Sequence, residues 1–288
     1  MGWNRRQVVA AAGLAAVARS TVFAEQAGPA LWVARSGPAK VYLFGDNPYQ
    51  RTPWRSPRIE AALAESTVLW RETPEGGGDA MGLFLAKGAD PARPLSAWLT
   101  AKDRARVAAA AAAVRLGDAA LERFRPWLAA IFLEDGFEAA CGFKAQNGPT
   151  AVLTALARGA GKPIRSEFPD EAQIVDDFAG FSPAAEVGAL MRAVGDIEAG
   201  PAAAERNAEA WAAGDQSLDL AAVLRMRRDF PDYYQRILVD RNRRWPARIR
   251  TMLDGGGTSF VLIGGDHLVG PDSVQRRLAA VGLEARRV

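Results

Sequence analysis

His267 is the only histidine in the 288-residue chain, and it stands three positions after Gly264 in the stretch FVLIGGDH. An imidazole can ligate a metal ion or transfer a proton near neutral pH. The glycines before it allow a tight turn or a close approach of a ligand to the backbone. A lone histidine is more often structural, so the chemistry of His267 depends on which side chains fold beside it.

Carboxylates next to short apolar runs are the other candidate ligands. Asp46 follows VYLFG, Glu72 follows STVLWR, Glu167 ends KPIRSE, and Asp266 directly precedes His267. One imidazole combined with several carboxylates favours manganese, magnesium or calcium over zinc or copper. The residue types therefore suggest a divalent metal of the manganese kind, if a metal is bound at all.

Two of these carboxylates have a purely structural alternative. Asp46, Asn47 and Pro48 together have the composition of a tight turn, and this reading and a ligand role for Asp46 are equally open. Glu72 precedes Thr-Pro, where a glutamate is usually a solvated residue at the end of a strand.

Arg241 and Asn242 lie in the charged stretch DRNRRWPAR. One interpretation is an exposed helix face whose arginine side chains reach into water. The other is an inward-facing arginine that binds a substrate carboxylate or pairs with Glu72. The spacing alone does not decide between them.

The elements that would position these residues predict an α/β (α+β) fold. VYLFG and FVLIGG are typical of buried strands, and STVLWRE, KPIRSE and the final EARRV are further candidates. Helical patterns fill most of the interval of about 80–240, with a cap at Ser182 and a break at Pro231. We expect a small central sheet formed from both chain ends, with a large helical insertion and a ligand site after the strands.

The first 24 residues have the pattern of a signal peptide. Arg5 and Arg6 precede a short Ala/Val/Leu run, and small residues precede Glu25. A buried N-terminal helix is the alternative, but Val8–Ala18 has no polar face. The paired arginines favour the twin-arginine route. We therefore expect residues 1–24 to be removed, residues 25–288 to form a single domain, and the product to be periplasmic or secreted.

Charge and cysteine content exclude several classes of protein. Arg5, Arg6 and Arg19 account for three of the 36 basic residues, which leaves 33 basic and 33 acidic residues after residue 24. A nucleic-acid partner is not expected without a net basic excess. Cys141 is the only cysteine, so an intramolecular disulfide and a cysteine-based zinc cage are both impossible. No later segment is apolar enough for a transmembrane helix in the mature chain.

Six segments, found in order over nearly all of the mature chain, resemble one known family. They are PALWVARSGPAKVYLFGDNP, VLWRETPE, RPWLAA, KPIRSEFPDEAQIVDDF, LVDRNRRWPARI and FVLIGGDHLVGPDSVQRRLAAVGLEARRV. This family is TraB/GumN, which is related to the TIKI metalloproteases and more remotely to the erythromycin esterases. The resemblance implies a site with two Gly-x-x-His motifs, an acidic residue after a strand, and an Arg-Asn pair on a late helix.

This chain matches the implied site only in part. The second motif is Gly264 to His267, the acid corresponds to Glu72, and the pair to Arg241 and Asn242. In the first motif Pro48 stands at the histidine position, and proline has no ligating side-chain atom.

The resemblance therefore implies two alternatives. The first is an exported metal-dependent hydrolase, a peptidase for example, in which His267, Glu72, Asp46 and Asp266 are the metal-ligand candidates. Glu72, Arg241 and Asn242 would then act on the substrate. The second is a non-catalytic binding protein that keeps the fold and pocket for an unknown peptide or small molecule.

Overall fold

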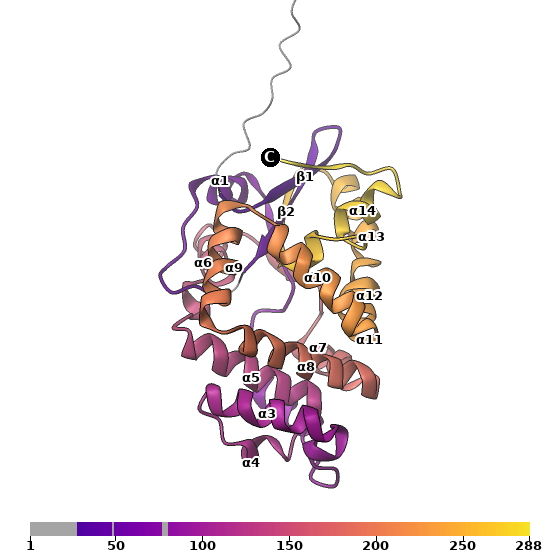
Figure 1. Cartoon of the computed structure of the whole chain (residues 1–288). Coiled ribbons are helices and arrows are strands. Elements are labelled where there is room, and N and C mark those ends of the chain that lie inside the picture. Colours follow the sequence, from indigo (N-terminus) through magenta and orange to yellow (C-terminus); the bar gives the residue numbers. More distant parts are fainter. Residues whose placement is uncertain (1–27, 48, 77–79) are drawn as a thin grey trace, which may run out of the picture.

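The computed structural model describes residues 28–47, 49–76 and 80–288, which form one mixed sheet surrounded by helices (Figure 1). The predicted signal peptide and Pro48 lie outside the described residues. Across the sheet the strand order is β4-β3-β5-β2-β1-β6. The strands are β1 (Leu31–Ser36), β2 (Ala39–Asp46), β3 (Val68–Arg71), β4 (Ile164–Ser166), β5 (Thr258–Gly264) and β6 (Ala285–Arg287).

The centre of the sheet joins the two ends of the chain. β5 pairs in parallel with β2 on one side and with β3 on the other, and β3 pairs in parallel with β4. β1 is antiparallel to both β2 and β6. The predicted α/β class, with both chain ends in one sheet and a large helical region between them, is confirmed. The sequence analysis did not predict β1.

Both faces of the sheet are buried, which explains why β2 and β5 are apolar almost throughout. Phe44 and Leu262 belong to the core cluster on one face, with Ile59 of α1 (Pro57–Glu65). Val261 belongs to the opposite cluster, with Ile249 of α13 (Trp245–Asp254). The sheet is therefore the rigid middle layer of the molecule.

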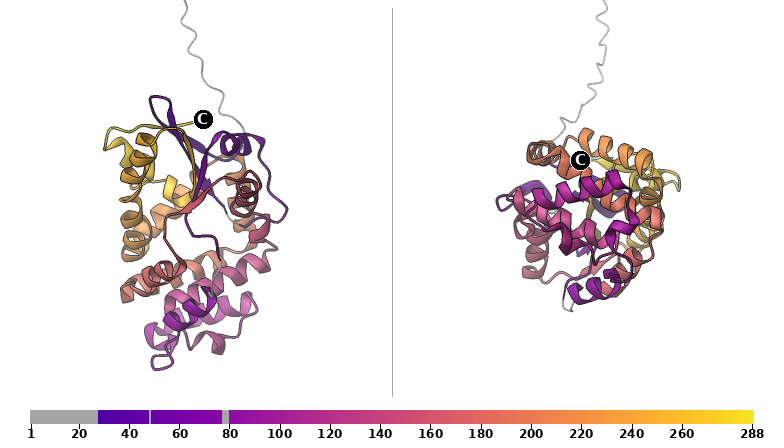
Figure 2. Two further views of the ribbon diagram at one scale, coloured as in Figure 1. Left: turned by 180° about the vertical axis from the view of Figure 1, so that it is seen from behind. Right: turned by 60° about the horizontal axis from the view of Figure 1, so that its bottom comes forward.

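The helical region has its own core and lies beyond the carboxyl ends of the central strands (Figure 2). Within the described residues, none of the helices combines the length and apolarity needed to cross a bilayer. The remaining elements are α2 (Ala80–Gly88), η1 (Leu95–Trp98), α3 (Ala101–Ala113), α4 (Asp118–Leu121), α5 (Pro126–Ala140), η2 (Ala145–Asn147), α6 (Pro149–Gly159), α7 (Glu171–Ala179), α8 (Pro183–Ala199), α9 (Pro201–Ala213), α10 (Ser217–Asp229), α11 (Pro231–Tyr234), η3 (Gln235–Val239), α12 (Asp240–Asn242), η4 (Gly265–Leu268) and α14 (Val274–Ala279).

Two predicted helix boundaries are confirmed. Ser182 precedes α8, and its hydroxyl accepts a hydrogen bond from the Ala185 N–H at 3.1 Å. This bond satisfies one of the backbone donors left free at a helix start. At the predicted break, α10 ends at Asp229 and α11 begins at Pro231.

Candidate functional site

The centre of the candidate site is a buried arginine between two carboxylates. Arg241 Nη2 lies 2.8 Å from Glu72 Oε1 and 2.6 Å from Glu167 Oε2. Arg241 is only 4% exposed and its guanidinium also faces the Phe168 ring, so the interpretation of an exposed arginine is wrong. The pairing of Arg241 with Glu72, one of the two inward alternatives, is confirmed.

Glu72 uses both of its carboxylate oxygens within the protein. Oε1 pairs with Arg241, and Oε2 accepts a hydrogen bond from the Gly264 N–H at 3.0 Å. Burial by itself would raise the pKa of Glu72, but Arg241, His267 and the Gly264 N–H together lower it to about 2. Glu72 is therefore an anion at neutral pH, and it joins the end of β3 to the end of β5.

One turn of π-helix precedes the Arg-Asn pair. η3 ends at Val239, and α12 begins with Asp240. A π turn adds a residue to the helix and rotates the residues after it, and such turns are frequent at functional sites. Arg241 and Asn242, which follow this turn, are both buried, at 4% and 1% exposure.

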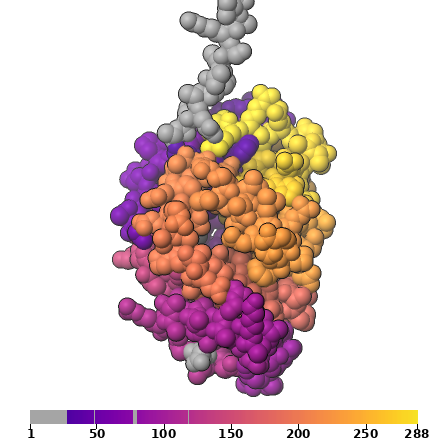
Figure 3. All heavy atoms as spheres, viewed as in Figure 1, coloured from indigo at the N-terminus to yellow at the C-terminus, as the bar shows by residue number. Residues whose placement is uncertain are grey.

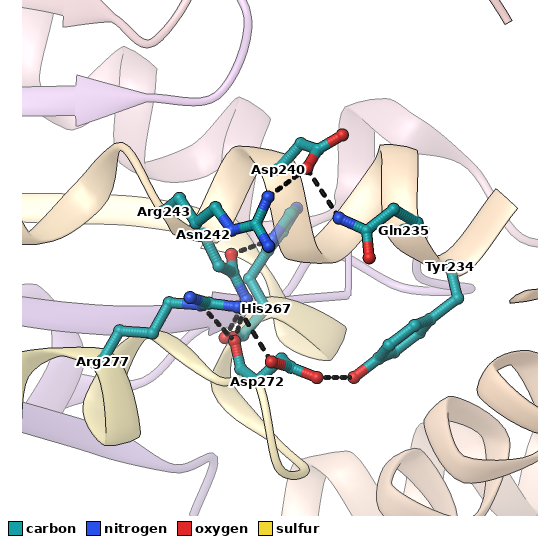
Figure 4. A network of polar contacts seen from close by, with 8 residues as sticks. All are labelled: Tyr234, Gln235, Asp240, Asn242, Arg243, His267, Asp272 and Arg277. Carbon is teal, nitrogen blue, oxygen red and sulfur yellow. Dashed lines mark hydrogen bonds and ion pairs between the residues drawn. The ribbon is translucent and has the colours of Figure 1, made fainter. Parts of the chain in front are cut away.

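His267 is buried against Asn242 (Figure 4). The Asn242 amide nitrogen donates to two backbone carbonyls, those of His267 at 3.3 Å and Asp272 at 2.9 Å. Its Oδ1 is therefore free to accept, and it lies 2.6 Å from His267 Nδ1. Since an amide oxygen cannot donate, the Nδ1–H group of His267 donates this hydrogen bond.

The loop after His267 is held by a further polar network, also visible in Figure 4. Asp272 accepts a hydrogen bond from the Tyr234 hydroxyl at 2.6 Å and pairs with Arg277 at 2.8 Å. The Asn242 amide and the Tyr234 hydroxyl fix the loop to the helical segment that carries Arg241, and Arg277 fixes it to α14. We infer that Asn242 positions His267.

Asp46 faces a different neighbour. It is the last residue of β2, and it accepts a hydrogen bond from the Thr150 hydroxyl of α6. Burial, with the nearby Glu72 carboxylate, raises the pKa of Asp46 to about 7, although Thr150 and Arg71 act in the opposite direction. Its other oxygen, Oδ1, is buried and has no hydrogen-bond partner among the described residues.

The predicted residues surround two adjoining cavities at the carboxyl edge of the sheet. The larger has a volume of about 670 Å³ and is lined by Asp46, Arg71 and residues of α6. The smaller, of about 210 Å³, is lined by Arg241, Asp266 and His267. Both include Glu72 and Gly264 in their walls. Figure 3 shows the surface hollowed between α9 and α10, the orange helices.

The two glycine turns predicted to share one edge lie in contact. A Cβ added at Gly45 would lie 3.0 Å from the Gly265 Cα, so a side chain here would push the two turns slightly apart. The Gly45 carbonyl accepts a hydrogen bond from the Trp211 indole at 2.9 Å. Gly45, Glu72 and His267 therefore lie at one edge of the sheet, as expected, and Glu72 and His267 share the smaller cavity, whereas Gly45 lines neither cavity.

Over the ranges that the structure describes, no group of three or more His, Cys, Asp or Glu side chains is placed to hold a metal ion. Glu72 is bound through both of its oxygens within the protein. Asp46 is hydrogen-bonded to α6, and Asp266 lies beside Asp219, whose pKa burial and Asp266 raise to about 6.

Comparison with known protein families gives one match, to the TraB/PrgY/gumN family over residues 30–287. The chain belongs to this family. The match includes the first strand, the helical region and the C-terminal strand, so the TraB/PrgY/gumN assignment applies to the whole described fold. No curated protein and no solved structure matches the chain.

The sequence analysis of this TraB/PrgY/gumN protein missed several polar residues of the larger cavity, among them Arg71, Thr150 and Thr154. Arg71 directly precedes Glu72 at the end of a predicted strand, and this position was an available signal. Thr150 and Thr154 are four residues apart on α6, a spacing that places them on one helix face but does not say what that face covers.

The raised pKa of Asp46 predicts a pH-dependent stability. Between pH 4 and pH 7 the folded protein keeps a proton that the unfolded chain has lost, so wild-type stability falls as the pH rises and levels off above pH 7. Asp46→Asn removes this dependence. We expect the stability of the variant relative to wild type to increase by about 2–3 kcal/mol from pH 5 to pH 8, because each pKa unit corresponds to about 1.4 kcal/mol. Urea unfolding of both proteins at pH 5 and pH 8 measures this change. A stability difference between variant and wild type that is the same at both pH values would contradict the prediction.

Proposed function

We propose that this TraB/PrgY/gumN protein is an exported, non-catalytic binding protein that takes up a peptide or small molecule at the carboxyl edge of its sheet. One observation carries the proposal: both oxygens of Glu72 are already bound, by Arg241 and by the Gly264 N–H. The acid expected to serve a metal or a substrate instead holds the fold together.

Releasing Glu72 for a metal would be costly. Arg241 would then keep Glu167 as its only carboxylate partner while remaining 4% exposed, and a buried charge is stable only when it is paired. The Gly264 N–H would also lose its acceptor. A binding role needs none of these changes, because the carboxyl edge keeps cavities of about 670 and 210 Å³ next to the ion pairs.

A metal-dependent hydrolase is the second candidate, and the environment of His267 favours it. Metal-binding histidines usually donate their other ring N–H to a fixed acceptor. His267 Nδ1 and Asn242 Oδ1, 2.6 Å apart, have this arrangement, and His267 is close enough to Glu72 to lower the pKa of that carboxyl.

Metal analysis of the mature protein, purified from the periplasm without chelator, tests the proposal. We expect clearly substoichiometric manganese, zinc and other divalent metals, because both oxygens of Glu72 are bound within the protein. The N-terminal sequence of the same sample tests export, and it should begin near Glu25. One tightly bound ion per chain that is lost in His267→Ala would contradict the proposal and favour the hydrolase. An uncut cytoplasmic product would contradict export.

A further inference from the structure

The larger cavity contains three buried polar atoms that have no hydrogen-bond partner among the described residues. They are Asp46 Oδ1, Arg71 Nε and Thr154 Oγ1. Buried polar groups in folded proteins are almost always hydrogen-bonded, and leaving one unpaired costs about 1–3 kcal/mol. Three such atoms in one cavity are available to hydrogen-bond a polar ligand.

The strand register brings these atoms together. Asp46 pairs with Gly264 at the end of β2, and Arg71 pairs with Leu262 at the end of β3, so β5 lies between them. Neighbouring strands are about 4.8 Å apart, so the two backbones are separated by about 10 Å. Because Phe44 also pairs with Leu262, and side chains alternate along a strand, Asp46 and Arg71 project from the same face of the sheet.

Helix α6 covers this face. It contributes Thr150, which holds one oxygen of Asp46, and Thr154, which is 7% exposed. The remaining wall includes Tyr49 and the alanines Ala151 and Ala155. The cavity therefore combines an acid and an arginine on its floor with hydroxyl and small apolar groups opposite.

The two floor residues are an acid and a guanidinium, but they do not satisfy each other. Asp46 and Arg71 interact electrostatically, since the charge of Arg71 acts to lower the pKa of the Asp46 carboxyl while burial raises it. In the described part of the chain they nevertheless form no ion pair, and each keeps a buried unpaired atom. A ligand between them needs an acceptor anion at one end and a donor at the other.

We propose that this cavity binds a free α-amino acid, with its carboxylate at Arg71 and its ammonium group at Asp46. The assignment rests on the binding function proposed above. A guanidinium pairs with a carboxylate through two parallel hydrogen bonds, and an aspartate accepts from an ammonium group. The hydroxyl of Thr154 gives a third polar contact, and the volume of about 670 Å³ leaves room for the ligand side chain.

Each half of the ligand can be tested separately. The probes are the individual L-amino acids, screened by thermal shift, followed by calorimetry of the best binder, its amide and its N-acetyl derivative. We expect the amide and the N-acetyl form to bind about 10–100-fold more weakly, because each loses one hydrogen-bonded ionic contact. A derivative that binds as well as the parent would overturn the assignment, and so would a screen without any binder.

Variants locate the binding. Arg71→Gln and Thr154→Val should weaken binding of the best amino acid, by about 10–100-fold and by about tenfold respectively. Arg165→Gln is the matched control, since Arg165 is an exposed arginine on the neighbouring strand and lies outside this cavity. Circular dichroism confirms that each variant is folded, and Thr154→Val keeps the test valid if Arg71→Gln does not fold. Unchanged binding in both cavity variants would overturn the proposed site.

Metal analysis of the same preparation separates the two possible failures. Amino-acid binding by metal-free protein supports both the site and the non-catalytic function. Metal-free protein that binds no amino acid overturns the ligand class and leaves the binding function standing. A stoichiometric metal overturns the non-catalytic function, whatever the amino-acid result.

Discussion

Replacing Arg241 with methionine should lower the free energy of unfolding by about 3–5 kcal/mol, the usual cost of removing one partner from a buried ion pair. The substitution keeps much of the side-chain volume but leaves Glu167, itself 3% exposed, and Glu72 without their shared cation. Chemical denaturation of the wild type and the variant measures the change.

A matched control distinguishes the loss of the buried ion pair from the effect of placing methionine in this helical segment. Arg243 lies two residues further along, and its side chain is 59% exposed and pairs with Asp240. Exposed ion pairs contribute at most about 1 kcal/mol, so Arg243→Met should have a small effect. A loss below about 1 kcal/mol for Arg241→Met would show that the two carboxylates do not depend on this arginine.

The second large effect concerns the position at which a second histidine is expected in the family. We expect Pro48→His to raise the affinity for manganese, cobalt or zinc by at least tenfold, since even an outer residue of a metal site commonly changes affinity by about 10–100-fold. Gly45, near the end of β2, contacts Gly265, two residues before His267, so the end of β2 lies beside the His267 turn.

A double-mutant cycle decides whether the gain comes from a shared ion. Adding His267→Ala to Pro48→His should abolish the gain, because two imidazoles would bind the same metal. Calorimetric titration of the wild type, both single variants and the double variant provides the four values. A gain that survives His267→Ala would mean that the new histidine binds metal elsewhere.

The two cavities show how one edge of the sheet keeps a pocket although the Glu72 carboxylate is fully bonded within the protein. Glu72 lies in the wall of both cavities and is bonded to Arg241 and the Gly264 N–H. Arg71, one residue earlier, projects to the opposite face and stays unpaired at Nε. The alternation of a strand thus gives two adjacent charged residues different roles.

The sequence alone determined the elements that are marked by local patterns. Apolar runs ending in glycine predicted β2 and β5, and the Ser182 and Pro231 signals predicted helix boundaries. Parallel strands present their carboxyl ends at one edge, so the common location of Gly45, Glu72 and His267 followed from the strand assignment. These features depend on backbone propensity and hydrophobic period, which act over a few residues.

Only the tertiary structure decided which polar atoms meet. The partner of Asp46 is Thr150 on α6, and those of Arg241 are Glu72 and Glu167, all far away along the chain. No local pattern encodes such pairs, because packing of the helices against the sheet sets the distances between them. Burial then determines protonation: it makes Asp46 a weak acid, while the paired Arg241 keeps Glu72 ionised, although both carboxylates follow similar strands.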